Sequence, residues 1–134
     1  MYHTLEQKKN NMRVIIAGGR NYSDYVELCN ICDAVLEGTS DIEIVSGTAK
    51  GTDSLGERYS LERGHGLKKF PADWNKHGKS AGYIRNKQMA EYADGLIAFW
   101  DGESKGTLHM INLAKERSLK VRIYNFILKS IVDI

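Results

Sequence analysis

Residues 14–20 are VIIAGGR, and this short stretch decides the fold class. Its first residues are apolar and mostly β-branched, which predicts a buried strand, and the two glycines predict a tight turn directly after it. Ser23 or Asp24 is placed to cap a helix with apolar residues at spacings of three and four, and Gly38 is placed to end it. A buried strand, a glycine-bearing loop and an amphipathic helix in this order predict the start of a β-α-β unit.

The same unit recurs along the chain. Strands are expected at residues 42–45, 67–72, 96–100 and 121–124, and helices at 52–63, 81–92 and about 106–117. The strand with Pro71 is the most polar, which favours a place near the sheet edge, whereas the apolar 96–100 is expected at the centre. The pattern predicts a single α/β domain with a doubly wound, mostly parallel sheet of about five strands and helices on both faces.

Both ends of the chain fall outside this pattern. Residues 1–11 are polar and lack periodicity, so we expect a flexible leader, with Met12 as an alternative start. The domain is expected over residues 12–125. The apolar tail, residues 126–134, is expected to form a short docking helix or part of an oligomer contact, which leaves a homo-oligomer open.

Length, net charge and cysteine content exclude several classes of protein. A chain of 134 residues suffices for one domain, and its net charge of +2 argues against duplex nucleic acid as a partner. No apolar run approaches the ~20 residues of a membrane span, so we expect a cytoplasmic protein without a membrane partner. Cys29 and Cys32 lie on the apolar stripe of the first helix, which predicts a place in the core rather than a metal or redox role.

Glycine-bearing loops follow four of the expected strands, at residues 18–21, 46–53, 78–82 and 101–107. In a parallel sheet such loops meet at the carboxyl edge of the strands. Small residues let a ligand approach the backbone, and the helices that follow present free N–H groups and a dipole that favours anions. The loops therefore predict a site for a nucleotide or another phosphorylated ligand, with Gly18, Gly19, Gly47 and Gly51 giving close approach.

The first two loops carry the charged candidates Arg20, Lys50 and Asp53. Arg20 offers a bidentate fork for phosphate. The second loop differs from a P-loop because Lys50 precedes Gly51, yet Lys50 and the Ser46 hydroxyl remain candidates for phosphate contacts. Asp53 has three alternatives: a ribose hydroxyl partner, a general base, or a complement to the helix dipole.

The last two loops add aromatic, basic and hydroxyl groups. Trp74 is expected either to stack on a base or to plug the core, and His77 and His109 are not expected in the site. Asp101 is a candidate for ribose binding or general-base work, with a turn cap as the alternative. The remaining candidates for anion contacts are Lys79, Ser80, Arg85, Asn86, Ser104, Lys105, Gly106 and Thr107.

These motifs together resemble the YspA/cpYpsA-related branch of the SLOG superfamily. The similarity rests on five stretches in the same order: Gly18-Gly19-Arg20 with Tyr22 and Asp24; Ser46-Gly47 with Ala49, Gly51 and Asp53; Phe70, Ala72 and Trp74; Gly78-Lys79, Ala81-Gly82, Arg85-Asn86 and Met89; and Phe99-Trp100-Asp101-Gly102 with Ser104 and Gly106-Thr107. The resemblance implies a Rossmann-like fold and the binding of a nucleotide-derived small molecule, as a sensor or sequestering module.

Two alternatives to simple binding follow from superfamily relatives. LOG-type phosphoribohydrolases cleave a base from a nucleotide, and here Asp53 and Asp101 would be the catalytic carboxylates. The chain departs from the LOG pattern because no proline precedes the last loop's glycine and no glutamate follows Thr107. The weaker alternative is single-stranded nucleic-acid binding. No ligand spacing demands a metal, so no cofactor is expected, and Mg²⁺ would enter only with a phosphate ligand.

Overall fold

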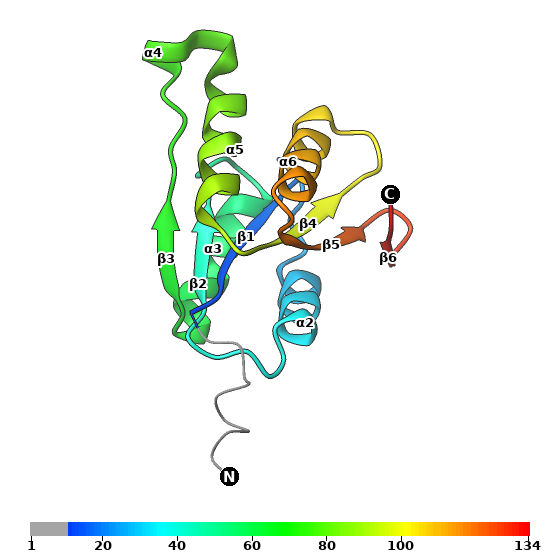
Figure 1. The fold of residues 1–134 in the computed structure, drawn as a ribbon. Coiled ribbons are helices and arrows are strands. Elements are labelled where there is room, and N and C mark those ends of the chain that lie inside the picture. Colours follow the sequence, from blue (N-terminus) through cyan, green and yellow to red (C-terminus); the bar gives the residue numbers. More distant parts are fainter. Residues whose placement is uncertain (1–10) are drawn as a thin grey trace.

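The computed structural model describes residues 11–134. The leader expected at residues 1–11 lies outside this range apart from Asn11. Six strands form one sheet (Figure 1): β1 (Arg13–Gly18), β2 (Glu43–Ser46), β3 (Gly66–Lys69), β4 (Gly95–Trp100), β5 (Lys120–Asn125) and β6 (Ser130–Val132).

The strand order is β3-β2-β1-β4-β5-β6, and every neighbouring pair is parallel except β5 and β6. The expected α/β fold with a doubly wound, mostly parallel sheet is confirmed, with six strands in place of about five. β1 and β4 lie at the centre and β3 at an edge, as the apolar and polar character of their residues indicates. Pro71 follows β3 and leaves its ladder intact.

Four helices cover the two faces of the sheet (Figure 1). On one face lie α2 (Tyr25–Val35) and α3 (Thr52–Arg63), and on the other α5 (Ala81–Tyr92) and α6 (Lys105–Glu116). Val14 and Ile16 of β1 pack with the first pair, whereas Ile15 packs with the second. Because alternate side chains of a strand point to opposite faces, a strand covered on both sides must be apolar throughout.

The helix ends follow the expected local chemistry in most places. Asp24 caps α2 by accepting the Glu27 N–H at 3.0 Å, and Gly64 ends α3 with a left-handed φ of 71°. At the end of α2 the structure differs from the expectation, because Leu36 caps this helix and Gly38 lies in the following turn. Two short elements, α4 (Trp74–His77) and η1 (Gly78–Ser80), occupy what was expected to be loop.

The two cysteines lie in the core as expected. Cys29 and Cys32 are both free and buried on the side of α2 that faces the sheet. Burial raises the pKa of the Cys32 thiol, which keeps it protonated and unreactive. None of the helices within residues 11–134 is long and apolar enough to cross a bilayer.

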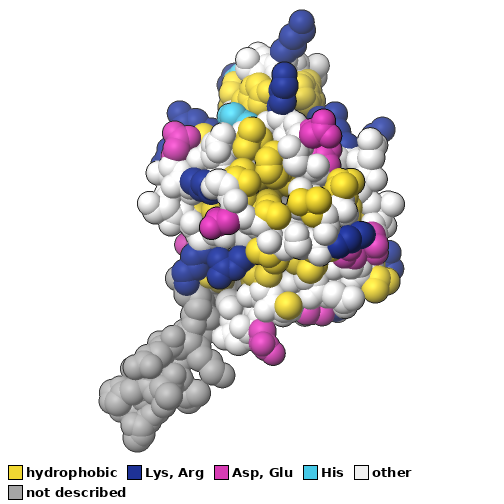
Figure 2. Space-filling view, turned by 90° about the vertical axis from the view of Figure 1, so that its right-hand side faces the viewer, with side chains coloured by type: hydrophobic (Ala, Val, Ile, Leu, Met, Phe, Trp, Pro, Cys, Tyr) yellow, Lys and Arg dark blue, Asp and Glu magenta, His cyan; other side chains and the backbone are white. Residues whose placement is uncertain are grey.

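The C-terminal tail differs from the expected docking helix. Asn125 accepts the N–H groups of Ile127 and Leu128 at 2.9 and 3.0 Å, and this turn leads into the antiparallel edge strand β6. The tail therefore turns back to pair with β5 instead of forming a helix. Figure 2 shows hydrophobic side chains gathered on this face, where Ile131 is 52% exposed.

Candidate ligand-binding site

A cleft of about 640 Å³ opens at the carboxyl ends of β1 and β4, and we call it the main cleft. The chain moves outward from β1 through β2 to β3 and then returns to place β4 on the other side of β1. Ligands of open α/β sheets bind at such a reversal of strand order. The expected site residues that line the main cleft are Gly18, Gly19, Arg20, Asp53, Trp74, Lys79, Arg85, Asn86, Asp101, Ser104, Gly106 and Thr107.

A second cavity of about 480 Å³, the side hollow, adjoins the main cleft. The two share four residues, Arg20, Ala49, Trp74 and Arg85. Gly47 and Lys50 line the side hollow alone. The two arginines therefore stand at the junction of both cavities.

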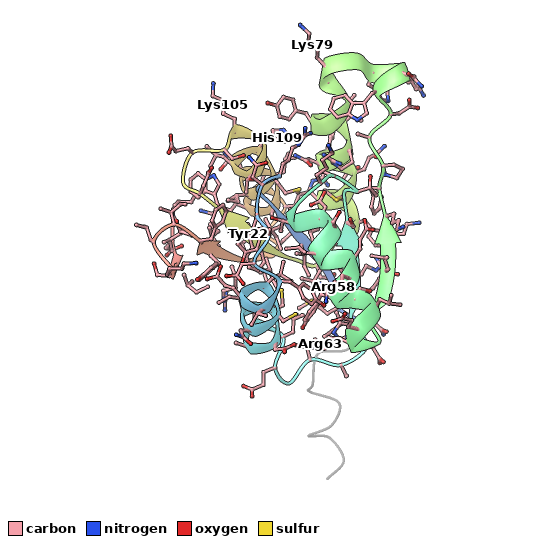
Figure 3. All side chains as sticks on the ribbon, turned by 180° about the vertical axis from the view of Figure 1, so that it is seen from behind. Tyr22, Arg58, Arg63, Lys79, Lys105 and His109 are labelled. Carbon is pink, nitrogen blue, oxygen red and sulfur yellow. The ribbon has the colours of Figure 1, made fainter. Side chains whose placement is uncertain are left out.

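Four expected residues line neither cavity: Ser46, Gly51, Ser80 and Lys105. The buried Ser46 hydroxyl donates to Glu57 at 2.6 Å and accepts the Thr48 N–H at 3.0 Å. Gly51 lies so close to the first loop that a Cβ there would be 2.3 Å from the Arg20 carbonyl oxygen. Lys105 extends away from the molecule (Figure 3).

Arg20 and Arg85 give the site its positive charge. The Arg85 Nη1 donates to the Gly47 carbonyl and its Nε to the Asn86 Oδ1 at 3.0 Å, which fixes the guanidinium at the cavity junction. Burial lowers the pKa of Arg85, and the nearby charge of Arg20 acts in the same direction. Within residues 11–134 the Arg20 guanidinium has no hydrogen-bond partner, so its donors remain available to a ligand.

Asp53 lies beneath the two arginines in the first turn of α3. Its side chain is buried, and Oδ2 accepts the Ala49 N–H at 2.9 Å. Burial raises the pKa of this carboxyl, against the Ala49 hydrogen bond and the charges of Arg85 and Arg20. One carboxylate cannot neutralise two guanidinium groups, and the cluster retains an excess positive charge that suits an anion.

Asp101 follows β4 and caps the turn before α6. Its Oδ1 accepts the N–H groups of Glu103 and Ser104, each at 2.8 Å. These two bonds hold the pKa of Asp101 below its usual range, which keeps the side chain ionised at neutral pH. The geometry gives Asp101 the turn-cap role, while the same residue also lines the main cleft.

Apolar and aromatic side chains also line the main cleft. Tyr22, Tyr83, Phe126 and Ile127 line it, and none was among the expected site residues. The Tyr22 and Phe126 rings lie 4.8 Å apart, centroid to centroid. Phe126 and Ile127 directly follow β5, so the rule that carboxyl ends of parallel strands meet at one edge is a signal that could have found them.

The comparisons with known proteins agree with this architecture. The model of the YspA, cpYpsA-related SLOG family matches residues 12–77. The Gene 61 protein of Mycobacterium phage D29 is 33% identical to this chain over an alignment 116 residues long, which covers 81% of this chain and 93% of that protein. This chain belongs to the YspA, cpYpsA-related SLOG family.

A solved structure supports the fold of this SLOG-family chain. The DNA processing protein A (DprA) from Streptococcus pneumoniae superposes with a TM-score of 0.67 over 86% of this chain, at 18% sequence identity. The SLOG-family chain spans about half of that structure, 53% of its length. At this identity the likeness shows the Rossmann-type fold alone.

In this SLOG-family chain His109 of α6 packs behind the cleft. Its Nδ1 lies 3.1 Å from the Asn86 Nδ2, and its ring contacts Tyr83 at 4.4 Å between centroids. Figure 3 shows His109 between α5 and α6. Among residues 11–134, no three His, Cys, Asp or Glu side chains gather closely enough to hold a metal ion.

Proposed function

We propose that this chain binds a phosphorylated, nucleotide-derived small molecule in the main cleft, as a sensor or sequestering module. One observation carries the proposal: Arg20 and Arg85 converge on the junction of two cavities above a single buried carboxylate. Arginine forks suit phosphate oxygens, and a cavity of this size suits a small ligand. Membership of the SLOG family supports a nucleotide-related ligand.

The proposal divides the cleft by chemistry. Arg20 and Arg85 bind the phosphate, together with backbone N–H groups at the start of α6 near Gly106. Lys79 approaches from the rim of the same cleft. Trp74, which is 53% exposed and lines both cavities, offers a face on which a base can stack rather than a plug for the core, because aromatic rings stack on every base.

Hydrolysis of such a ligand is the second candidate, and Asp53 is the residue that favours it. A buried carboxyl with a raised pKa is suited to protonate a leaving base, and Asp53 lines the main cleft. Asp101 would then contribute a fixed negative charge near the sugar, because its two backbone hydrogen bonds keep it ionised.

The test is a thermal-shift screen of the full chain against nucleotides, dinucleotides, ADP-ribose derivatives, cyclic oligonucleotides and short single-stranded DNA. Hits are measured by calorimetry and recovered for chromatography. A micromolar binder at millimolar concentration raises the apparent stability measurably. A ligand recovered intact supports binding, one recovered as base and sugar phosphate supports hydrolysis, and a response to single-stranded DNA alone contradicts the proposal.

Two variants with the same change of charge locate the site. Arg20→Ala removes one charge-assisted contact worth ~1.5–3 kcal/mol, which weakens binding by about 10- to 150-fold. Lys105→Ala is the matched control, because Lys105 lines neither cavity, and we expect less than about a twofold effect. Equal losses in both variants would mean that net charge, rather than the cleft, attracts the ligand.

A further inference from the structure

The side chains of Arg85, Asn86 and His109 are joined by two hydrogen bonds, and the chemistry of the groups fixes which atom donates in each. The Arg85 guanidinium can only donate, so the Asn86 oxygen must accept its Nε–H at 3.0 Å. The Asn86 amide nitrogen then points to His109 Nδ1, 3.1 Å away, and it can only donate there. His109 Nδ1 must therefore accept, which requires the neutral imidazole with its proton on Nε2.

We propose that His109 is a positioning residue that orients Arg85 in the main cleft through Asn86, and that protonation of His109 weakens anion binding there. The anion-binding part rests on the proposed function. The coupling between His109 and Arg85 rests only on the geometry of the two hydrogen bonds that join them through Asn86.

Burial makes this coupling obligatory. Asn86 lines the main cleft but is only 7% exposed, so its amide has little access to water that could replace a lost partner. The contact between the His109 and Tyr83 rings holds the imidazole in place from the other side. A protonated His109 presents an Nδ1–H to the Asn86 Nδ2, which places two donors face to face.

Rotation of the Asn86 amide does not relieve this conflict. If the amide oxygen turns towards a protonated His109, the amide nitrogen turns towards the Arg85 Nε–H, and two donors again face each other. Arg85 then loses one of the two contacts that hold it, and keeps the Gly47 carbonyl. The guanidinium is then held at the junction of the two cavities by one hydrogen bond in place of two.

The surroundings of His109 favour the neutral form. Burial lowers its pKa, and Glu116 on the same helix opposes the shift. On α5 the Tyr83 phenol and, beyond Asn86, the Arg85 guanidinium face the ring. Of the strands packed against α6, β4 carries no titratable side chain. The titratable side chains of β1 and β5 do not contribute to the pKa shift of His109; they are Arg13, Lys120, Arg122 and Tyr124.

The first experiment observes both hydrogen bonds by NMR spectroscopy of the ¹⁵N-labelled protein. We expect the His109 ring to show the neutral form with the proton on Nε2 at neutral pH, and the Arg85 Nε–H resonance to move as His109 titrates. A His109 with its proton on Nδ1, or an Arg85 signal indifferent to the titration, would overturn the coupling.

Two variants separate the hydrogen-bond acceptor from the ring. His109→Asn places an oxygen near the position of Nδ1 without a titratable group, so the Arg85 signal should stay constant with pH. His109→Phe keeps the ring contact with Tyr83 but removes the acceptor, so the Arg85 signal should resemble that of the acidified wild type at every pH. An unchanged signal in His109→Phe contradicts a positioning role.

The second experiment measures inorganic sulfate binding from about pH 8 to about pH 5, where sulfate keeps its charge and histidine does not. In the wild type the dissociation constant should rise by about two- to tenfold on acidification, as expected for one lost hydrogen bond. His109→Asn keeps Asp53 and the other titratable groups of the site, so it should bind sulfate as the wild type does at about pH 8 and more tightly than the wild type at about pH 5. An identical pH dependence in the two proteins would overturn the proposal. Absence of sulfate binding at every pH would count against the proposed function, and the resonance experiment would then decide the coupling by itself.

Discussion

Gly18 and Gly106 both line the main cleft, but a Cβ at these two positions would meet different surroundings. Substitution by alanine is therefore predicted to change the free energy of unfolding in opposite directions. At Gly18 of β1, a Cβ would lie 2.1 Å from the Phe99 carbonyl oxygen and 2.9 Å from its carbonyl carbon. Gly18 pairs with Phe99 across the centre of the sheet, and the neighbouring Gly19 N–H donates to that same oxygen at 3.1 Å. At Gly106 in the first turn of α6, a Cβ would meet nothing within 4 Å.

The magnitudes follow from these contacts. Gly18→Ala forces two central strands apart, which costs ~1–3 kcal/mol for overpacking and a similar amount for the disturbed hydrogen bond of Gly19. The total loss of about 2–6 kcal/mol is a large share of the ~5–15 kcal/mol that stabilises an ordinary domain. Gly106→Ala removes the conformational entropy of a helical glycine and should stabilise the protein by about 0.5 kcal/mol.

Urea denaturation of the two variants and the wild type measures both effects. With a slope of ~2 kcal/mol per molar, Gly18→Ala should lower the midpoint by about 2 M, and Gly106→Ala should raise it slightly. A Gly18→Ala midpoint equal to that of the wild type would refute the close approach of β1 and β4. Ligand affinity measured on the stable Gly106→Ala protein then tests whether a phosphate contacts the backbone at the start of α6.

Three further outcomes are expected. Asn125→Ala leaves two backbone N–H groups of the tail without their acceptor and should lower the free energy of unfolding by ~1–3 kcal/mol, measured by urea denaturation. Tyr59→Phe removes the 2.7 Å bond from its hydroxyl to Asp33 and should cost about 1 kcal/mol, and a smaller loss in the background Asp33→Asn would confirm the pairing. Burial lowers the pKa of His65 and of His109 below 6.5, so near this pH the unfolded chain binds more protons than the folded protein. The free energy of unfolding should therefore fall as the pH drops from 6.5 towards the pKa values of these histidines in the folded protein. Urea midpoints that rise on acidification through this window would contradict this prediction.

The fold could be predicted because each central strand must be apolar throughout. Residues 96–100 are apolar since β4 is covered by helices on both faces, and the polar β3 lies at the edge. The end of α3 at Gly64 also follows local sequence, because a left-handed residue that ends a helix is most easily glycine. These features depend on near neighbours in the sequence.

The parts that could not be predicted depend on distant contacts. Strand β6 has three residues, too few to show an alternating pattern, and exists because the Asn125 turn folds it back onto β5. Gly51 suggested a ligand contact, but its backbone lies against the first loop instead. Likewise, no spacing in the sequence relates His109 to Arg85, since Asn86 joins them across two helices.

The residues that line the main cleft come from different parts of the chain. Arg20 and Asp53 belong to the segment matched by the family model, residues 12–77, whereas Phe126 and Ile127 come from the turn before an edge strand. Phe126 packs against the core of β1 and β4, whereas Ile127 is 65% exposed, so a substitution of Ile127 leaves these central strands untouched. If the proposed function is correct, selection can therefore alter the organic group that is accepted through exposed positions such as Ile127, and relatives with the same arginines can diverge in ligand without first changing their core.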